Sequence, residues 1–216
     1  MATVARAVLP SFRPGVHSIL TAVSLTLSCA PAGPKAFSSA GLAGPEITPP
    51  LPKPDLILRD TDGTSFDLRR ETEGYLTLLF FGYTHCPDLC PVQLANIASA
   101  MKRLDPDVTA RIKVVFVTVD PRRDTPQVVR TWLDHFNPGF IGLTGDSASI
   151  AYAFTQLRLD HPMTPEPVAG DSSLYTVNHT VLVLAFTPDN LAHVAYPTGI
   201  RPQQWMNDLR LLVKGG

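Results

Sequence analysis

The stretch Tyr75-Leu-Thr-Leu-Leu-Phe-Phe-Gly-Tyr-Thr-His-Cys-Pro-Asp-Leu-Cys-Pro91 decides the fold. Its first nine residues, 75–83, form a nearly continuous apolar run. Continuous apolarity predicts a strand that is buried on both faces, as in the centre of a parallel sheet. A helical pattern of apolar residues then opens at Pro87, where proline suits a first turn that needs no N–H. Cys86 and Cys90 are therefore expected at the junction of a buried strand and a helix.

Strands and helices alternate on both sides of this stretch. A hairpin is expected before it, at 56–58 and 65–68, because a turn sequence separates two apolar segments. The remaining strands are expected at 112–119, 140–143, 180–186 and 191–196, and the remaining helices begin near 125, 147 and 202. This order predicts an α/β protein with a thioredoxin-like fold, in which a central mixed sheet has flanking helices and an N-terminal β-hairpin.

Composition excludes several classes of protein. The chain has 216 residues, of which 44% are hydrophobic and 17% charged, and its net charge is −1. The hydrophobic share is ample for one core. The composition as a whole does not fit a collagen, a coiled coil or a polytopic membrane protein. Because no basic run is present, we expect no nucleic-acid partner. Nothing in the sequence offers an obvious extra interface, so a monomer is expected.

The N-terminal quarter differs from the rest, since nine of the 21 prolines fall in residues 1–54. A basic start and a short apolar stretch ending at Cys29 predict an export or membrane-anchor segment over 1–30. Cys29 fits a lipoprotein signal; an ordinary signal peptide or an uncleaved anchor is the alternative. Residues 31–54 are interpreted as a proline-rich tether and 55–216 as the folded domain. We expect the domain to lie in the cell envelope on the periplasmic side, with the mitochondrial inner membrane as the alternative.

Two thiols four residues apart lie on one side of a helical turn, where the N-terminal amides favour the thiolate. Cys86 and Cys90 could be packing residues or an inert disulfide, but both explain the position poorly. A structural zinc site usually has four ligands, and the domain has only this pair. Two thiolates and one imidazole suit copper, since sulfur holds Cu(I) and nitrogen helps to hold Cu(II).

The histidine expected nearest to the thiols is His179, directly before the strand at 180–186. In a thioredoxin-like fold the loop that enters this strand lies beside the helix that carries the cysteines. A structural histidine is the alternative interpretation of His179. The other histidines are expected in the export segment, beside Cys86 but turned away, at a helix end, in a proline-rich loop and on the sheet surface (His17, His85, His135, His161 and His193).

Three motifs, GYTHCPDLCP at 82–91, VTVDPRRDTP at 117–126 and NHT at 178–180, resemble those of the Sco/SenC copper chaperones. The resemblance implies a tethered thioredoxin-like protein that helps to assemble the dinuclear copper centre of cytochrome c oxidase. It implies that Cys86, Cys90 and His179 bind one copper ion, and it places the aspartates of the second motif at 120 and 124. The chain departs from the family pattern at Asn178, where aspartate is common.

Two functions follow as hypotheses. In the first, the chain is a metallochaperone, not an enzyme, that takes copper from an upstream donor and delivers it to the copper-accepting subunit of a terminal oxidase. In the second, Cys86 and Cys90 form the redox pair of a thiol–disulfide oxidoreductase that reduces the cysteines of that subunit or of another envelope protein. A peroxidase is a distant third, because the spacing of Thr84 and Cys86 does not fit one.

Overall fold

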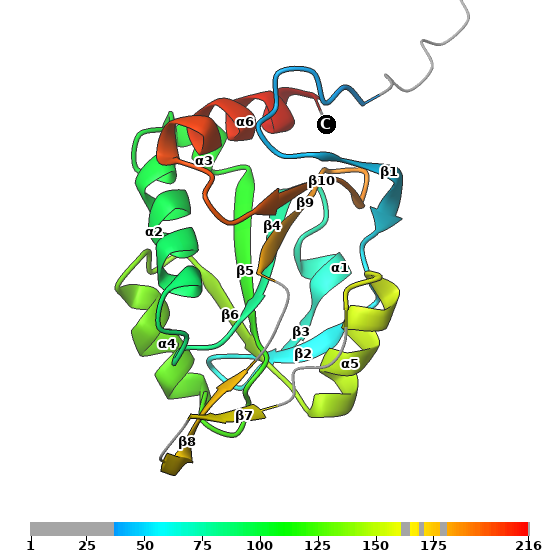
Figure 1. Cartoon of the computed structure of the whole chain (residues 1–216). Coiled ribbons are helices and arrows are strands. Elements are labelled where there is room, and N and C mark those ends of the chain that lie inside the picture. The colour runs from blue at the N-terminus through cyan, green and yellow to red at the C-terminus, as the bar shows by residue number, and fades with distance from the viewer. Residues whose placement is uncertain (1–36, 161–164, 169–170, 178–180, 216) are drawn as a thin grey trace, which may run out of the picture. The chain divides into compact units, whose positions relative to one another are not determined.

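An eight-stranded mixed sheet carries the fold, with strands in the order β1-β10-β9-β4-β5-β6-β2-β3 (Figure 1). The strands are β1 (Glu46–Pro52), β2 (Ile57–Asp60), β3 (Ser65–Asp67), β4 (Leu76–Gly82), β5 (Ile112–Thr118), β6 (Ile141–Thr144), β9 (Leu182–Phe186) and β10 (Leu191–Pro197). A separate two-stranded sheet consists of β7 (Pro165–Val168) and β8 (Asp171–Val177). The computed structural model describes residues 37–160, 165–168, 171–177 and 181–215.

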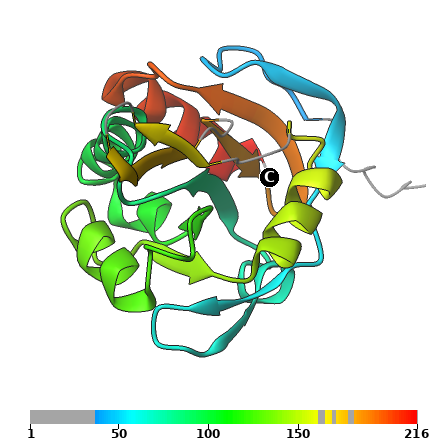
Figure 2. The same ribbon diagram turned by 60° about the horizontal axis from the view of Figure 1, so that its bottom comes forward.

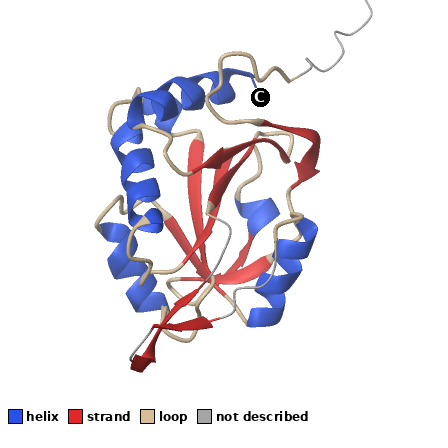
Figure 3. Cartoon of the chain, in the orientation of Figure 1, coloured by secondary structure: helices blue, strands red, loops and turns tan. Residues whose placement is uncertain are grey.

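Helices cover both faces of the large sheet (Figure 3). They are α1 (Leu68–Glu71), α2 (Leu89–Met101), α3 (Pro106–Thr109), α4 (Pro126–Asp134), α5 (Ser147–Gln156) and α6 (Pro202–Gly215). Buried residues of α2, α4 and α6 pack in one cluster, whereas those of α1 and α5 pack in another on the opposite face. None of the helices in the described ranges is long and apolar enough to cross a membrane.

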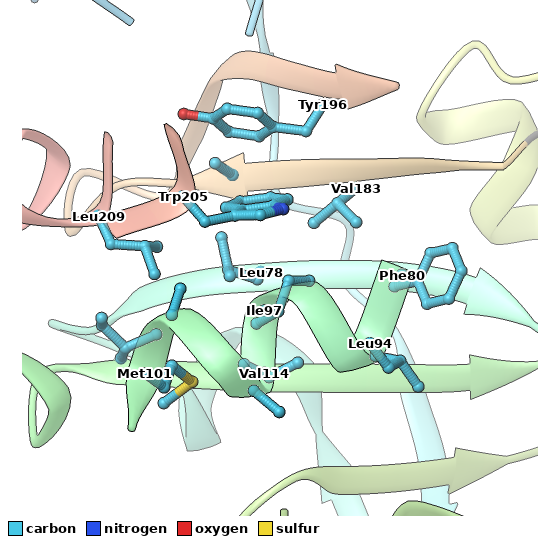
Figure 4. Close-up of a cluster of buried hydrophobic side chains, with 14 of the residues drawn as sticks. Leu78, Phe80, Leu94, Ile97, Met101, Val114, Val183, Tyr196, Trp205 and Leu209 are labelled. Carbon is cyan, nitrogen blue, oxygen red and sulfur yellow. The ribbon is translucent and has the colours of Figure 1, made fainter. Parts of the chain in front are cut away.

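The central strands are buried on both faces, as their continuous apolarity predicts. Along β4, Leu78 and Phe80 face the first cluster, while Leu79 and Phe81 face the second. In the first cluster, Trp205 of α6 packs beside the β4 strand and α2 (Figure 4). The parallel strands β4, β5 and β6 lie beside the antiparallel strands β9 and β10. The predicted mixed sheet with an N-terminal hairpin, β2–β3, is confirmed.

The folded part begins further upstream than the sequence suggested. Residues 31–54 were expected to be a tether, but β1 pairs antiparallel with β10, with Leu51 opposite Ala192. The prolines of β1 disguise it, because proline cannot donate to a sheet ladder and is tolerated mainly at an edge. Since β1 is an edge strand, only one of its sides needs hydrogen bonds. The expected boundary at residue 55 is therefore wrong for this segment.

The segment 37–45 before β1 is also held against the domain. The Ala43 N–H donates to the carboxylate of Asp208 on α6 at 2.7 Å. Phe37 stacks on His193 with ring centroids 4.1 Å apart, and His193 in turn bonds Asp189. His193 was expected on the sheet surface but is only 9% exposed, because Phe37 of this segment stacks on it.

Lys53, assigned to the tether by its sequence context, is buried with 1% of its surface exposed. Its ammonium donates to Thr72 Oγ1 at 2.8 Å and to Thr77 Oγ1 at 3.2 Å. Burial is the main cause that lowers the pKa of Lys53 from 10.5 to about 8. The neighbouring hydroxyls replace only part of the hydration of the ammonium. The folded state therefore favours the neutral amine more than the unfolded chain does.

This lowered pKa predicts a pH dependence of stability. Between pH 8 and 10.5 the unfolded chain keeps a proton on Lys53 that the native chain has lost, so stability rises with pH. Relative to K53M, the wild type should gain up to about 3 kcal/mol across this window. Urea denaturation of both proteins at pH 7.5 and 10 measures the difference. A difference that stays constant with pH would contradict the assignment.

Candidate metal centre

The loop between β4 and α2 builds the dithiol. The helix begins at Leu89, two residues later than Pro87, so Cys86 lies in the loop and Cys90 in the first turn. The Cys90 N–H donates to the sulfur of Cys86 at 3.4 Å. The N-terminal amides of a helix have no partner within it. Here the Cys86 sulfur takes one of them, while the N-cap Asp88 makes no side-chain capping bond.

The two thiols differ in exposure, and the pKa of the buried one is raised. Cys86 is partly exposed, whereas Cys90 is fully buried, and both are present as thiols. The hydrogen bond from the Cys90 thiol to Cys86, followed by burial, raises the pKa of Cys90. The proton therefore stays on Cys90, and the accessible sulfur of Cys86 is the one that meets an incoming partner first.

Gly82 makes room for the buried sulfur. A Cβ atom at this position would lie 3.0 Å from Cys90 Sγ and 2.8 Å from the ring of Phe116. The Phe116 ring belongs to the core of the sheet and cannot easily move. The glycine in the GYTHC stretch is therefore required by close packing against the Cys90 side chain.

Asp124 fastens the dithiol loop to the neighbouring strand. Its fully buried carboxylate accepts hydrogen bonds from the Thr84 N–H at 2.9 Å, from Thr84 Oγ1 at 2.6 Å and from Thr118 Oγ1 at 2.6 Å. Asp124 and Thr125 are both residue types that cap helices well. Thr125 is the N-cap, accepting from the Val128 N–H, so Asp124 is available to turn inward.

Asp120, the other aspartate of the motif, forms an ion pair with Arg123 and is almost fully buried. The Arg123 guanidinium carbon lies 5.7 Å from the centre of the Tyr83 ring. Tyr83 is 3% exposed, and burial is the main cause that raises its pKa. The DPRRDTP segment thus contacts the GYTHC segment at two places, through Asp124 and through Arg123.

A groove beside the dithiol lies between the loop and α4, lined by Thr84, His85, Gln127, Val128, Thr131, Trp132 and His135. Exposed apolar residues surround this end of the molecule: Leu89 is 42%, Val92 49% and Val128 37% exposed. The ring nitrogen Nδ1 of His85 lies 3.1 Å from Thr84 Oγ1 and 3.6 Å from Asp124. The His85 ring is thus turned toward these oxygens.

The predicted third ligand is not placed. His179 and Asn178 lie outside the described residues, as does His161. Among the residues that are described, no three side chains of His, Cys, Asp or Glu are grouped so as to hold a metal ion. The two thiols lie together, and their role as ligands stays a prediction, as does that of His179.

Comparison with known proteins places the chain in a family. Residues 52–214 match the family described as SCO1/SenC. A "Protein SCO2 homolog, mitochondrial" of Danio rerio is 34% identical over 124 residues, which cover 57% of this chain and 43% of that protein. A "Putative copper-binding protein" of Stutzerimonas stutzeri is 34% identical over 137 residues, covering 63% of this chain and 64% of the relative. The chain thus spans less than half the length of the Danio rerio relative and about two thirds of the Stutzerimonas stutzeri relative.

Solved structures agree with the observed fold. Copper-bound ScoI of Bradyrhizobium japonicum has a TM-score of 0.63 and 30% identity, covering 78% of this chain and 98% of that one. Copper-bound yeast Sco1 has a TM-score of 0.67 and 26% identity, covering 77% of this chain and 90% of that one. The predicted thioredoxin-like fold is confirmed by these structures, and the chain belongs to the SCO1/SenC family.

Proposed function

We propose that this chain binds one copper ion through Cys86, Cys90 and His179 and delivers it to the copper-accepting subunit of a terminal oxidase. The observation that carries the proposal is the pair of thiols at the start of α2, joined by the Cys90 N–H···Sγ contact. Copper is bound in the related structures from Bradyrhizobium japonicum and yeast, and a bacterial relative is named for copper binding. Family resemblance supports His179 as the third ligand.

The donor set fits copper as cargo. Two soft sulfurs stabilise Cu(I), and one imidazole lets the same site accommodate Cu(II). Delivery requires the partner's ligands to replace those of the chain one at a time. Cys86 is the partly exposed sulfur, so exchange would begin there, while buried Cys90 keeps its hold until a second partner ligand arrives. The exposed apolar residues at this end would adjoin the docked partner.

We also propose that residues 1–30 attach the domain to a membrane, so that the copper site works in the cell envelope. The basic start and the apolar stretch before Cys29 support an export or anchor segment. Mitochondrial relatives and a family member described as a lipoprotein from Bacillus anthracis make both an inner-membrane and a lipid-anchored placement consistent with the family.

A copper titration of the full chain tests the proposal. In a C29S background the only thiols are Cys86 and Cys90. We expect the reduced, oxygen-free protein to develop intense sulfur-to-copper charge-transfer bands that saturate at one equivalent of Cu(II). His179→Ala should alter or abolish them. Oxidation to a Cys86–Cys90 disulfide without a stable coloured species, identical in the two proteins, would overturn the delivery function.

A second function is favoured by the unequal exposure of the thiols, which also suits thiol–disulfide exchange. The Cys86 thiolate would attack a partner disulfide, forming a mixed disulfide and releasing one partner thiol. Cys90 would then attack the Cys86 sulfur, releasing the second thiol and leaving a Cys86–Cys90 disulfide, so two electrons pass to the partner. A C90S variant should trap the mixed disulfide; no captured thiol partner would count against this function.

A further inference from the structure

Gln93 is a buried polar residue on the inward face of α2, one turn after Cys90. Only 1% of its surface is exposed, and its neighbours on this face, Cys90, Leu94 and Ile97, belong to the first core cluster. Neither Nε2 nor Oε1 of Gln93 has a hydrogen-bond partner among the residues that the structure describes. An amide buried without partners costs free energy, because it has lost its contacts with water. Since buried polar groups in native proteins are nearly always paired, this amide calls for an explanation.

The next amide side chain along the helix, that of Asn96, is paired. Its Nδ2 donates to the carbonyl oxygen of Ile200, between β10 and α6, at 3.2 Å. The helix α6 lies beside α2 in both ribbon views (Figures 1 and 2). The contact between these two helices thus has an amide of its own, and it does not use that of Gln93.

Helix geometry brings the Gln93 amide near the Cys90 sulfur. Residues three apart on a helix are neighbours, with about 5–6 Å between their Cβ atoms. Side chains on a helix also lean back over the preceding turn, toward the N-terminus. Cys90 and Gln93 are three apart and both lie within α2. The glutamine side chain is long enough for its amide to reach the sulfur, and either end of the amide can turn there because neither is paired.

The other sides of the Cys90 side chain are already occupied. On the sheet side it packs closely against Gly82, where an added Cβ atom would lie 3.0 Å from the sulfur and 2.8 Å from the Phe116 ring. Neither a glycine nor a phenylalanine side chain can donate a hydrogen bond. On the loop side lies Cys86, whose sulfur accepts the Cys90 N–H at 3.4 Å. Gln93 is therefore the uncommitted side-chain donor that α2 itself supplies beside the buried thiol.

We propose that Gln93 is a positioning residue, whose amide N–H donates a hydrogen bond to the Cys90 sulfur when that sulfur binds copper. A thiolate bound to a metal carries negative charge that a neutral thiol lacks, and a buried charge is stabilised by a donor. The amide that is unpaired in the copper-free chain is then paired. The chain thus loses some stability without copper and gains affinity for it. This inference rests on the proposed function, because it assigns to Gln93 a task in the copper-bound state.

The test replaces the amide with an apolar side chain of similar length, as Q93M, and compares it with L94M. Leu94 is fully buried in the same cluster, and L94M changes its shape without removing a polar group. Both variants and their parent are full chains that carry C29S. The first readout is urea denaturation of the reduced, copper-free proteins. Q93M should lower the equilibrium constant for unfolding by at least about 5-fold, because an unpaired buried amide is removed. L94M should be no more stable than the parent.

The second readout is copper binding. Q93M should bind Cu(I) about 10- to 100-fold more weakly in competition with a chromophoric chelator, as for one hydrogen bond to a charged group. Its Cu(II) charge-transfer bands should move to longer wavelength, because the hydrogen bond no longer stabilises the sulfur electrons. L94M should change neither property. The parent gives a third readout that needs no variant: the NMR signals of the Gln93 NH₂ group should shift downfield when Cu(I) is added.

Opposite changes in stability and in copper affinity distinguish this role from a purely structural one. A copper-free Q93M that is less stable than its parent would show that the amide is paired without copper, and would overturn the inference. So would parental affinity and spectra in Q93M, unmoved Gln93 NH₂ signals, or equal losses of affinity in L94M; each of these leaves copper binding by the parent intact. A parent that binds no copper would instead overturn the proposed function, and with it this role of Gln93.

Discussion

Replacing either thiol of the pair, as C86S or C90S, should lower the affinity for copper by more than about 100-fold. Loss of a group that merely orients a ligand costs 10- to 100-fold, so loss of a ligand should cost at least the upper value. Serine keeps the size of the side chain but replaces a soft sulfur with a hard oxygen, which Cu(I) binds poorly. Competition with a chromophoric Cu(I) chelator, in full chains carrying C29S, measures the affinities.

The two variants should differ in reactivity although both lose copper. C90S keeps the partly exposed Cys86, which should be alkylated quickly. C86S keeps only Cys90, which is fully buried and should react much more slowly. The C29S parent serves as the control for both. Wild-type copper affinity in either variant would show that the pair is not the ligand set, and equal alkylation rates would contradict the assigned asymmetry.

Replacing Asp124 with alanine should destabilise the chain by about 3 kcal/mol or more, because three hydrogen bonds to a buried carboxylate are lost together. The Thr84 N–H would be left without its acceptor in the interior. Since Thr84 is two residues from Cys86, the dithiol loop should loosen as well. Urea denaturation of the reduced, copper-free protein measures the loss of stability, and the copper titration measures the effect on the site.

Asparagine at the same position should be much milder than alanine. Its oxygen can accept from the Thr84 N–H and from Thr118, as Oδ2 of Asp124 does, while its NH₂ group donates to the Thr84 hydroxyl, which can rotate to accept. D88A is a suitable surface control, because the Asp88 side chain makes no capping bond; a change within about 0.5 kcal/mol is expected. If D124N proved as damaging as D124A, the charge and not the hydrogen bonds would be the main contribution.

Much of the fold was predictable because its signals are local. The strand at β4 and the thiol pair follow from a single continuous stretch, and the helix at α4 follows from Thr125 and Pro126. The strand β1 was missed because its prolines hide an edge strand, and Lys53 because lysine is seldom buried. The hairpin β7–β8 lies in a stretch that its prolines marked as a loop.

The site was predictable only in part, for a physical reason. The four-residue spacing brought out Cys86 and Cys90, although only Cys90 lies in the helix. No pattern in the sequence shows that Asp124 turns inward while Thr125 caps the helix, because both residue types are good caps. His179 stays a prediction from its motif and from the family.

Residues 37–45 lie across α6 and β10, at the end of the sheet away from the start of α2 (Figure 1). The chain therefore enters the domain at one end, while the thiols lie at the other. The seven residues of β4 alone put about 23 Å between these ends, at 3.3 Å per residue. A rotation of the domain about residue 37 would therefore move the thiols further than it moves the residues near that end. A tether attached there would raise the encounter rate with a partner on the same surface without crowding the dithiol.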